Sequence, residues 1–280
     1  MLCNEEELAE LRNVCRRIRL SIINTIADAG AGHTGGSLSE VEILAALYFR
    51  VMRIDPSRPH WPDRDRFILS KGHASPGYYC TLAARGYFDE GRLAGFDAID
   101  SMLQGHPCMR KTPGVDMSTG SLGQGLSAGA GMILGRDQLG MHFHVYVLLG
   151  DGELQEGQVW EAAMFAGQRK LKGLIAIVDN NLVQLSGTVP GTLDLEPLAG
   201  KWKAFHWQVL ECDGHDVAGV VHAIEEARQA SESGPVVVIA HTTKGKGVSF
   251  MEGNAGWHGK PMNAEEYANA AKELGGCIDA

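Results

Sequence analysis

The sequence predicts an α/β protein in which a parallel β-sheet is covered by helices on both faces. Short apolar runs such as residues 145–149 and 174–178 have the length and composition of strands buried on both faces. Longer segments with helical periodicity lie between these runs, and strands that alternate with helices normally form a parallel sheet. No linker-like change in composition divides the chain. We therefore expect one domain, residues 1–280, with its functional edge where the strands end.

The expected elements follow from apolar periodicity and from turn residues. Helices are expected near residues 6–29, 39–51, 77–84, 89–95, 154–170 and 217–230, with a further helix that opens at the glycine loop 120–125 and ends near 134. Strands are expected at 67–69, 145–149, 174–178, 207–211 and 236–242. Ser39 is expected to cap the second helix, because Glu42 would complete a capping box. The charged, proline-containing stretch 55–65 should be a surface loop, and residues 104–117 an irregular loop.

Composition and charge exclude some classes of protein. The 280 residues can bury a large core. The net charge of −9 and the pI near 5.6 argue against a nucleic-acid binder, which needs a basic face. An anionic cofactor is compatible with this charge, because helix N-termini, a metal ion and a few cations can supply a local positive field.

The cysteines and the N-terminus indicate a soluble cytoplasmic protein. No CxxC pair or zinc-ligand spacing occurs, so reduced thiols are expected at Cys3, Cys15, Cys80, Cys108, Cys212 and Cys277. Glutamates occupy positions 5–7, where a signal peptide would carry positive charge. No apolar stretch approaches the ~18 residues that a membrane span needs, so no membrane association is expected.

Two polar side chains at the ends of neighbouring strands predict a metal site. Asp151 lies in Gly150-Asp151-Gly152 after the first apolar run, and Asn181 follows it by thirty residues, after the second run. Either segment taken alone is more often a plain turn. Because neighbouring parallel strands end at the same edge, however, a carboxylate and an amide there can share one hard cation, with phosphate oxygens completing its shell. The pair therefore predicts a magnesium-diphosphate site.

Histidines and glycines in loops are the other candidate functional residues. His33, His73, His106 and His258 each lie in a loop that contains glycine or proline. Imidazoles there suit hydroxyls, phosphate oxygens and proton transfer near neutral pH, although each one taken alone is more often a surface histidine. The segment Gly120-Ser121-Leu122-Gly123-Gln124-Gly125 indicates either backbone contact with a flat heterocycle or close packing of a helix on the sheet.

These motifs together resemble the N-terminal half of a transketolase, a thiamine diphosphate enzyme. The segment from Gly150 to Asn181 is similar to the thiamine diphosphate signature of that family. Other segments are similar to transketolase segments in the same order, namely 31–33, 69–73, 105–107, 118–125, 243–247 and 257–261. The resemblance covers nearly the whole chain and implies a thiamine diphosphate-binding fold of the diphosphate-binding type.

The resemblance implies roles for the residues that bind cofactor and metal. Asp151 and Asn181 would bind Mg²⁺, or Ca²⁺ or Mn²⁺ in its place, through their side chains, and Val183 through its carbonyl. The residues implied to contact the diphosphate or nearby groups are Gly152, His73, His258 and Lys244. Gly120 and Leu122 would hold the aminopyrimidine ring through their backbone.

The resemblance also implies catalytic and interface residues. His33, His106 and His258 would be catalytic and would face the sugar hydroxyls. Glu156 and Glu161 are similar to acidic residues at a dimer contact that are linked to proton relay between two sites. Two solvated charges early in a helix, stabilised by the helix dipole, are the alternative for this pair.

The chain is shorter than a single-chain transketolase, which continues for more than this length again. The further part of such enzymes supplies the pyrimidine-binding domain, with the glutamate that activates the aminopyrimidine ring, and most groups that hold the substrate phosphate. We therefore expect this chain to be one subunit of a split transketolase, inactive alone. The expected assembly is a heterotetramer with a C-terminal partner subunit that carries the pyrimidine-binding domain.

The expected reaction is transfer of a two-carbon ketol unit from a ketose, or ketose phosphate, to an aldose. One alternative is another thiamine diphosphate reaction, either synthesis of deoxyxylulose phosphate or decarboxylation of a 2-oxo acid. The loop histidines favour a hydroxylated sugar donor over a 2-oxo acid. A non-catalytic cofactor-binding subunit is a further alternative, but it should lack the metal pair or the loop histidines, and both are present.

Overall fold

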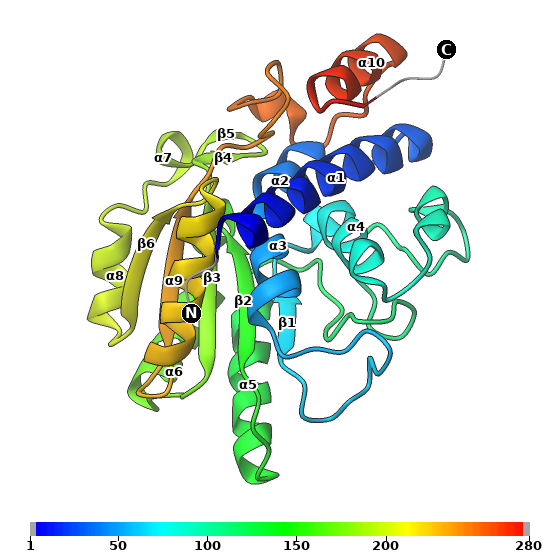
Figure 1. The fold of residues 1–280 in the computed structure, drawn as a ribbon. Helices are drawn as coiled ribbons and strands as arrows, with labels where there is room; N and C mark the ends of the chain where they lie inside the picture. Colours follow the sequence, from blue (N-terminus) through cyan, green and yellow to red (C-terminus); the bar gives the residue numbers. More distant parts are fainter. Residues whose placement is uncertain (1–3, 277–280) are drawn as a thin grey trace.

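A five-stranded parallel sheet lies between two layers of helices in the computed structural model, which describes residues 4–276 (Figure 1). The order across the sheet is β1 (Arg66–Leu69), β2 (Val145–Gly150), β3 (Leu174–Asn180), β7 (Val236–His241) and β6 (Gln208–Asp213). All neighbouring pairs are parallel, and the register of β2 and β3 places Gly150 beside Asp179. The five expected strands and their parallel arrangement are confirmed.

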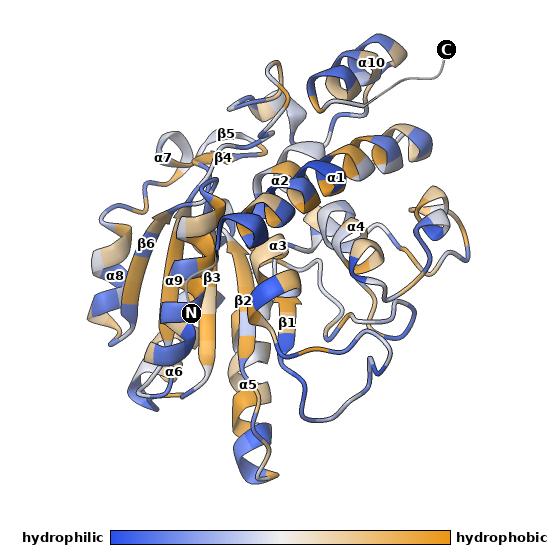
Figure 2. Ribbon diagram, in the orientation of Figure 1, coloured by the Kyte–Doolittle hydropathy of each residue, from blue (hydrophilic) through white to orange (hydrophobic). Residues whose placement is uncertain are grey.

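The central strands face two separate apolar cores, one on each side of the sheet. Tyr146 and Leu148 of β2 belong to the core under α1 (Glu5–Ala29), α3 (Val41–Ala46), α4 (Ser75–Arg85) and α9 (Val217–Ala230). Val145 and Val147 belong to the core under α5 (Gln124–Gln138), α6 (Gly157–Gln168) and α8 (Leu198–Ala204). Because both faces are covered, β2 and β3 are apolar along most of their length (Figure 2).

Shorter elements complete the fold. They are α2 (Thr34–Ser39), η1 (Leu47–Val51), η2 (Gly72–Ala74), η3 (Glu90–Gly95), η4 (Gly152–Gln155), β4 (Val183–Gln184), β5 (Gly187–Thr188), α7 (Val189–Thr192), η5 (Ala255–Trp257) and α10 (Ala264–Glu273). The β4–β5 hairpin, α7, α8 and α10 are not among the expected elements. The helix expected from residue 154 begins at Gly157, because the chain first forms the 3₁₀ turn η4.

The expected capping box at Ser39 and Glu42 is wrong. Ser39 is the last residue of α2, and its hydroxyl donates to the Asp179 carboxylate at 2.6 Å. Glu42 pairs instead with Arg19, and both N···O distances are 2.6 Å. Both side chains have partners far away in the sequence, which local periodicity does not reveal.

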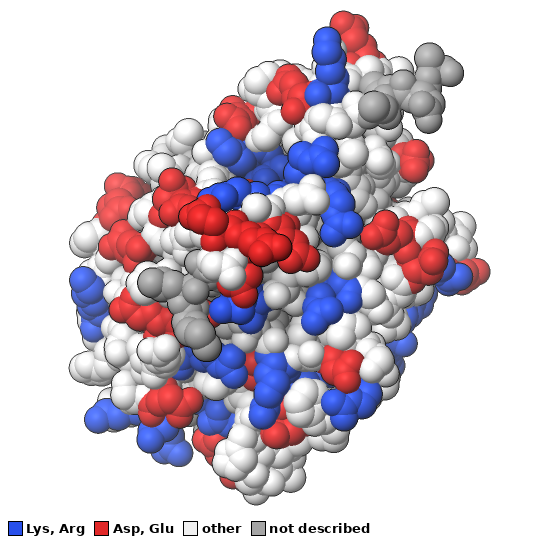
Figure 3. Space-filling view, viewed as in Figure 1, with Lys and Arg blue, Asp and Glu red and all other residues white. Residues whose placement is uncertain are grey.

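Other expectations concern the surface and the thiols. Cys15, Cys80, Cys108 and Cys212 are free, as expected, while Cys3 and Cys277 lie outside the described residues. Within residues 4–276, no helix is both long enough and apolar enough to cross a membrane. On the face viewed in Figure 3, acidic side chains form a band and basic side chains are scattered around it, so this face carries no continuous basic surface of the kind that binds nucleic acid.

Candidate active site

The candidate site lies at the edge of the sheet where the strands end. Lys71, Asp151 and Asn181 closely follow the ends of β1, β2 and β3, and Lys244 lies in the segment after β7. A cavity of about 360 Å³ opens there. Of the predicted site residues, those that line it are His33, His73, Gly120, Leu122, Asp151, Gly152, Glu156, Asn181, Val183, Lys244 and His258. The fold thus brings together all the predicted residues except His106 and Glu161.

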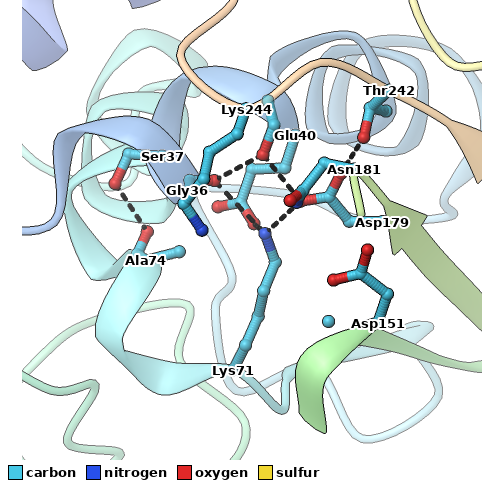
Figure 4. Close-up of polar contacts among 12 residues, drawn as sticks. Gly36, Ser37, Glu40, Lys71, Ala74, Asp151, Asp179, Asn181, Thr242 and Lys244 are labelled. Atoms are coloured by element: carbon cyan, nitrogen blue, oxygen red, sulfur yellow. Dashed lines mark hydrogen bonds and ion pairs between the residues drawn. The ribbon is translucent and has the colours of Figure 1, made fainter. Parts of the chain in front are cut away.

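A buried ion network forms one wall of this cavity. The Lys71 ammonium lies 2.6 Å from Asp179 and 2.8 Å from Glu40, and all three side chains are at most 3% exposed (Figure 4). Burial raises the pKa of Glu40 to about 8, although Lys71 opposes this shift. Burial also disfavours a charged Asp179, but Lys71, Ser39 and Thr242 donate to it and lower its pKa. The network therefore holds an ammonium and a carboxylate, and burial favours the protonated form of Glu40 beside them.

These three residues were not among the predicted site residues. Lys71 and Asp179 lie inside motifs that were singled out for their neighbours, so a signal for them was present. Glu40 offers no such signal, because only tertiary packing places it beside Lys71.

The predicted metal ligands face one another across the ends of β2 and β3. Asp151 accepts hydrogen bonds from the backbone amides of Gly152, at 2.8 Å, and Leu182. The Asn181 amide donates its Nδ2 hydrogen to Asp179 at 3.1 Å, and its oxygen accepts from the Val183 amide at 3.1 Å. The Val183 carbonyl accepts from the Lys244 ammonium at 3.0 Å. A carboxylate, an amide oxygen and a carbonyl therefore lie close together. The carbonyl already contacts a positive charge, the Lys244 ammonium.

This donor set fits a hard divalent cation, which prefers oxygen ligands. Burial, followed by the charge of Asp179, raises the pKa of Asp151 to about 6, so its carboxylate is mostly ionised at neutral pH. Within residues 4–276, no group of three or more His, Cys, Asp and Glu side chains could hold a metal ion. A cation here would consequently need the amide, the carbonyl and oxygen atoms from a bound ligand.

Polar atoms and glycines in the cavity wall also fit a bound phosphate compound. His258 Nδ1 is buried without a hydrogen-bond partner, an arrangement that is costly unless a ligand supplies one. A Cβ at Gly152 would lie 2.9 Å from the Gln184 side chain, so only glycine leaves the backbone accessible there. Lys71 and Lys244 supply positive charge to the same cavity.

Three predicted histidines form a compact cluster. The ring centroids lie 5.0 Å apart for His33 and His73, 5.3 Å for His33 and His258, and 5.1 Å for His73 and His258. Burial and then Lys71 lower the pKa of His73 to about 2, and burial and then Lys244 lower that of His258 to about 3. Burial, His106 and Lys244 lower the pKa of His33. The rings are therefore neutral, and each can donate one hydrogen bond and accept another, as sugar hydroxyls require.

The two predicted residues outside the cavity wall lie near it or on the surface. The ring of His106 packs beside Gly120, since a Cβ at Gly120 would lie 3.0 Å from it. Glu161 is exposed on α6, where Met164 and Phe165 are also 55% and 44% exposed. Glu156 is the N-cap residue of α6 and lines the cavity, but its side chain makes no capping hydrogen bond.

A second cavity, of about 350 Å³, lies elsewhere and is lined by Arg16, Arg19, Glu42 and His215, among others. It contains none of the predicted site residues. The two cavities are similar in size, so the assignment of the candidate site depends on its chemistry.

Comparison with known proteins identifies relatives along nearly the whole chain. The profile of the family described as "Transketolase, thiamine diphosphate binding domain" matches residues 11–278. The chain is 46% identical over 269 residues to the 6-deoxy-6-sulfo-D-fructose transketolase subunit SqwG of Clostridium sp., covering 96% of this chain and 98% of that one. It is also 46% identical to an apulose-4-phosphate transketolase subunit of Actinobacillus succinogenes, covering 96% of each.

Longer relatives match only in part. Human transketolase is 40% identical over 92% of this chain, but the match covers 41% of the human protein. Among solved structures, a mutant of Pichia stipitis transketolase in complex with xylulose 5-phosphate has a TM-score of 0.91 at 30% identity, and the match covers 96% of this chain and 41% of that one. Leishmania mexicana transketolase has a TM-score of 0.91 at 31% identity, with 96% and 42% covered. The chain therefore spans about two fifths of the length of these single-chain proteins.

Proposed function

Because the chain belongs to the transketolase family and carries its thiamine diphosphate-binding domain, we propose that it is the N-terminal subunit of a split transketolase. In this proposal the assembled enzyme transfers a two-carbon ketol unit from a ketose, or ketose phosphate, to an aldose acceptor. The observation that carries the proposal is the cavity at the strand ends, which brings together oxygen atoms of the kind that bind a hard cation, two lysines and three neutral histidines.

The lengths of the relatives support a split enzyme. Two relatives named as transketolase subunits match this chain along nearly their whole length, whereas it spans only part of single-chain transketolases. In the proposal a partner chain supplies the pyrimidine-binding domain. Two chains of each kind would form a heterotetramer, with Glu156 and Glu161 of this chain at the contact. The exposed Met164 and Phe165 beside Glu161 support this placement, because apolar side chains are enriched in the buried part of interfaces.

The chain's own residues would bind and orient the reactants. Asp151, Asn181 and the Val183 carbonyl would hold Mg²⁺, and the Gly152 backbone and Lys244 would hold the diphosphate. Lys244 would have to release the Val183 carbonyl, which it contacts at 3.0 Å, for the metal to bind there. Thiamine diphosphate, when bound, supplies the electron sink that ketol transfer needs and that amino-acid side chains lack.

The histidines would act on the sugar. His33, His106 and His258 would hold the donor hydroxyls, and a neutral imidazole can take a proton at one nitrogen while it donates at the other. His73 would contact the diphosphate. The four free cysteines in the described part of the chain are compatible with a reducing compartment such as the cytoplasm, which we include in the proposal.

Calorimetric titration with thiamine diphosphate and Mg²⁺ tests the proposal. The ligand is added to this chain alone, to a candidate partner alone and to their mixture. Tight, Mg²⁺-dependent binding that appears only in the mixture is the expected result. Tight binding by this chain alone would contradict the shared site, and no binding in any sample would remove the cofactor from the proposal.

A donor screen on the assembled enzyme tests the reaction. Ketoses and ketose phosphates, including 6-deoxy-6-sulfo-D-fructose, are compared with pyruvate as donors. Glycolaldehyde is the acceptor in each assay. Ketol transfer from a sugar is expected. Turnover of pyruvate without turnover of any ketose would instead indicate a deoxyxylulose-phosphate-forming or decarboxylating enzyme.

A further inference from the structure

A buried glutamate close to the predicted metal ligand Asp151 accepts hydrogen bonds from three segments of the chain. Glu153 is 3% exposed and lies two residues after Asp151, in η4. Its Oε1 accepts from the Ser70 hydroxyl at 2.5 Å and from the Gly123 amide at 2.8 Å, and its Oε2 accepts from the Gly150 amide at 3.1 Å. One carboxylate thus joins the ends of β1 and β2 to the glycine loop 120–125.

Ser70 extends this connection by one hydrogen bond. Its hydroxyl hydrogen is directed to Glu153, and its oxygen accepts from the Gly125 amide at 3.2 Å. Gly123 is the N-cap residue of α5 and has no side chain to cap the helix. Glu153 and Ser70 therefore satisfy free amides at the start of α5 from other segments of the chain, and an anion is favourable at a helix N-terminus.

The glycine loop 120–125 is packed tightly against Ser70 and the neighbouring Gly72. A Cβ at Gly125 would lie 2.3 Å from the Ser70 hydroxyl oxygen, and a Cβ at Gly72 would lie 2.7 Å from the Gly120 amide nitrogen. Gly123 has a φ of +82°, which L-residues with a side chain rarely adopt. The backbone of the loop is thus fixed by close contacts and by the Glu153 hydrogen bonds together.

We propose that Glu153 is a positioning residue that fixes the glycine loop 120–125, so that Gly120 and Leu122 are in place for the ring of the cofactor. This inference rests on the proposed function, because the cofactor is thiamine diphosphate. Glu153 also lines the cavity, but both of its oxygens accept from donors of the chain itself, so we assign it a positioning role and not a role in binding metal or sugar. Only a carboxylate serves here, because a glutamine would turn an NH₂ group towards at least one of three donors.

Binding of two different ligands distinguishes a role of Glu153 in positioning the glycine loop from a role in binding the diphosphate. Thiamine diphosphate needs both the metal site and the glycine loop, whereas inorganic pyrophosphate with Mg²⁺ needs only the metal site. In the complete assembly, we expect Glu153→Gln to weaken thiamine diphosphate binding at least tenfold, which corresponds to about 1.4 kcal/mol, and to change pyrophosphate binding less than twofold. Hydrogen exchange of the 118–126 amides should become faster in the variant.

Two further variants keep the test decisive. Ser70→Ala leaves the carboxylate in place and should give the same selective loss to a smaller degree, and it replaces Glu153→Gln if that variant does not fold. Glu265→Gln, on the exposed first turn of α10, makes the same chemical change elsewhere and should change the binding of neither ligand. Equal weakening of both ligands, or unchanged thiamine diphosphate binding, would overturn the role of Glu153. Failure of the wild-type assembly to bind either ligand would overturn the proposed function itself.

Discussion

Removal of the Lys71 ammonium is the perturbation with the clearest predicted effect on stability. The Lys71→Met variant keeps most of the side-chain volume but deletes the ion pair with Asp179, the 2.8 Å contact with Glu40 and the hydrogen bond at 3.2 Å to the Gly36 carbonyl. The variant leaves a buried carboxylate without its counterion. Breaking a buried pair in this way typically costs about 3–5 kcal/mol.

The structure places the expected cost at the lower end of that range. Asp179 keeps three donors, the Ser39 and Thr242 hydroxyls and the Asn181 amide. Burial raises the pKa of Glu40, and the variant removes the Lys71 charge that opposes this shift, so the neutral form of Glu40 is favoured and leaves no second buried charge. We therefore expect a loss of about 3 kcal/mol in the free energy of unfolding, or roughly 6–12 °C in Tm.

Urea denaturation of the isolated chain at pH 7 measures this loss. Lys203→Met, on the exposed side of α8, is the matched control and should change stability by no more than about 0.5 kcal/mol. The double variant Lys71→Met with Asp179→Asn removes both charges, and we expect its cost to fall at least about 1 kcal/mol short of the sum of the single variants. A Lys71→Met cost below about 1 kcal/mol, or strict additivity, would refute the reasoning.

Three other predictions concern pH, packing and the metal. The pKa of His73 is lowered to about 2, against ~6.5 in the unfolded chain, so below pH 6.5 the unfolded state binds a proton that the folded state excludes. Relative to His73→Asn, the wild type should lose about 1.3 kcal/mol between pH 7 and 5.5, and parallel urea-derived stability curves for the two proteins would contradict this. Gly125→Ala should cost about 1–3 kcal/mol because its Cβ meets Ser70, whereas Gly131→Ala, on the same helix with nothing within 4 Å, should stabilise by up to about 1 kcal/mol. Urea denaturation measures both effects, and a change of the same sign in the free energy of unfolding at both positions would contradict this prediction. Asp151→Asn in the complete assembly should weaken Mg²⁺-dependent thiamine diphosphate binding by on the order of 100-fold or more. Removal of Mg²⁺ from the wild type with EDTA should weaken binding to a similar degree. Unchanged affinity of the variant by calorimetry would exclude Asp151 as a metal ligand.

Sequence patterns predicted well the strands and helices whose burial follows a regular pattern along the whole element. The apolar runs of β2 and β3 are buried on both faces, so composition alone identifies them. The helix α9 was expected at its observed bounds, because its apolar face recurs with helical period and Asp216 caps its start. The boundary at α6 was misplaced, since local sequence does not separate a 3₁₀ turn from the first turn of an α-helix.

The candidate site divides in the same way. Asp151, Asn181 and the loop histidines could be selected from sequence, because they follow strands or lie in glycine loops, and the sheet then gathers them at one edge. Their roles towards metal, diphosphate and sugar remain predictions. Lys71 and Asp179 were overlooked, and Ser39 was assigned to a helix cap, because their partners lie up to 140 residues away along the chain.

The sequence by itself determined the strand-helix order, the edge at which the predicted site residues lie and the family to which the chain belongs. Those properties depend on local periodicity and on short motifs, which a single chain displays directly. Only the tertiary structure decided that burial favours the protonated form of Glu40 beside Lys71, that three histidines are neutral, and that Glu153 accepts hydrogen bonds from the glycine loop. The physical reason is that the charge state and hydrogen-bond partners of a buried polar group depend on burial and on neighbours brought together by folding.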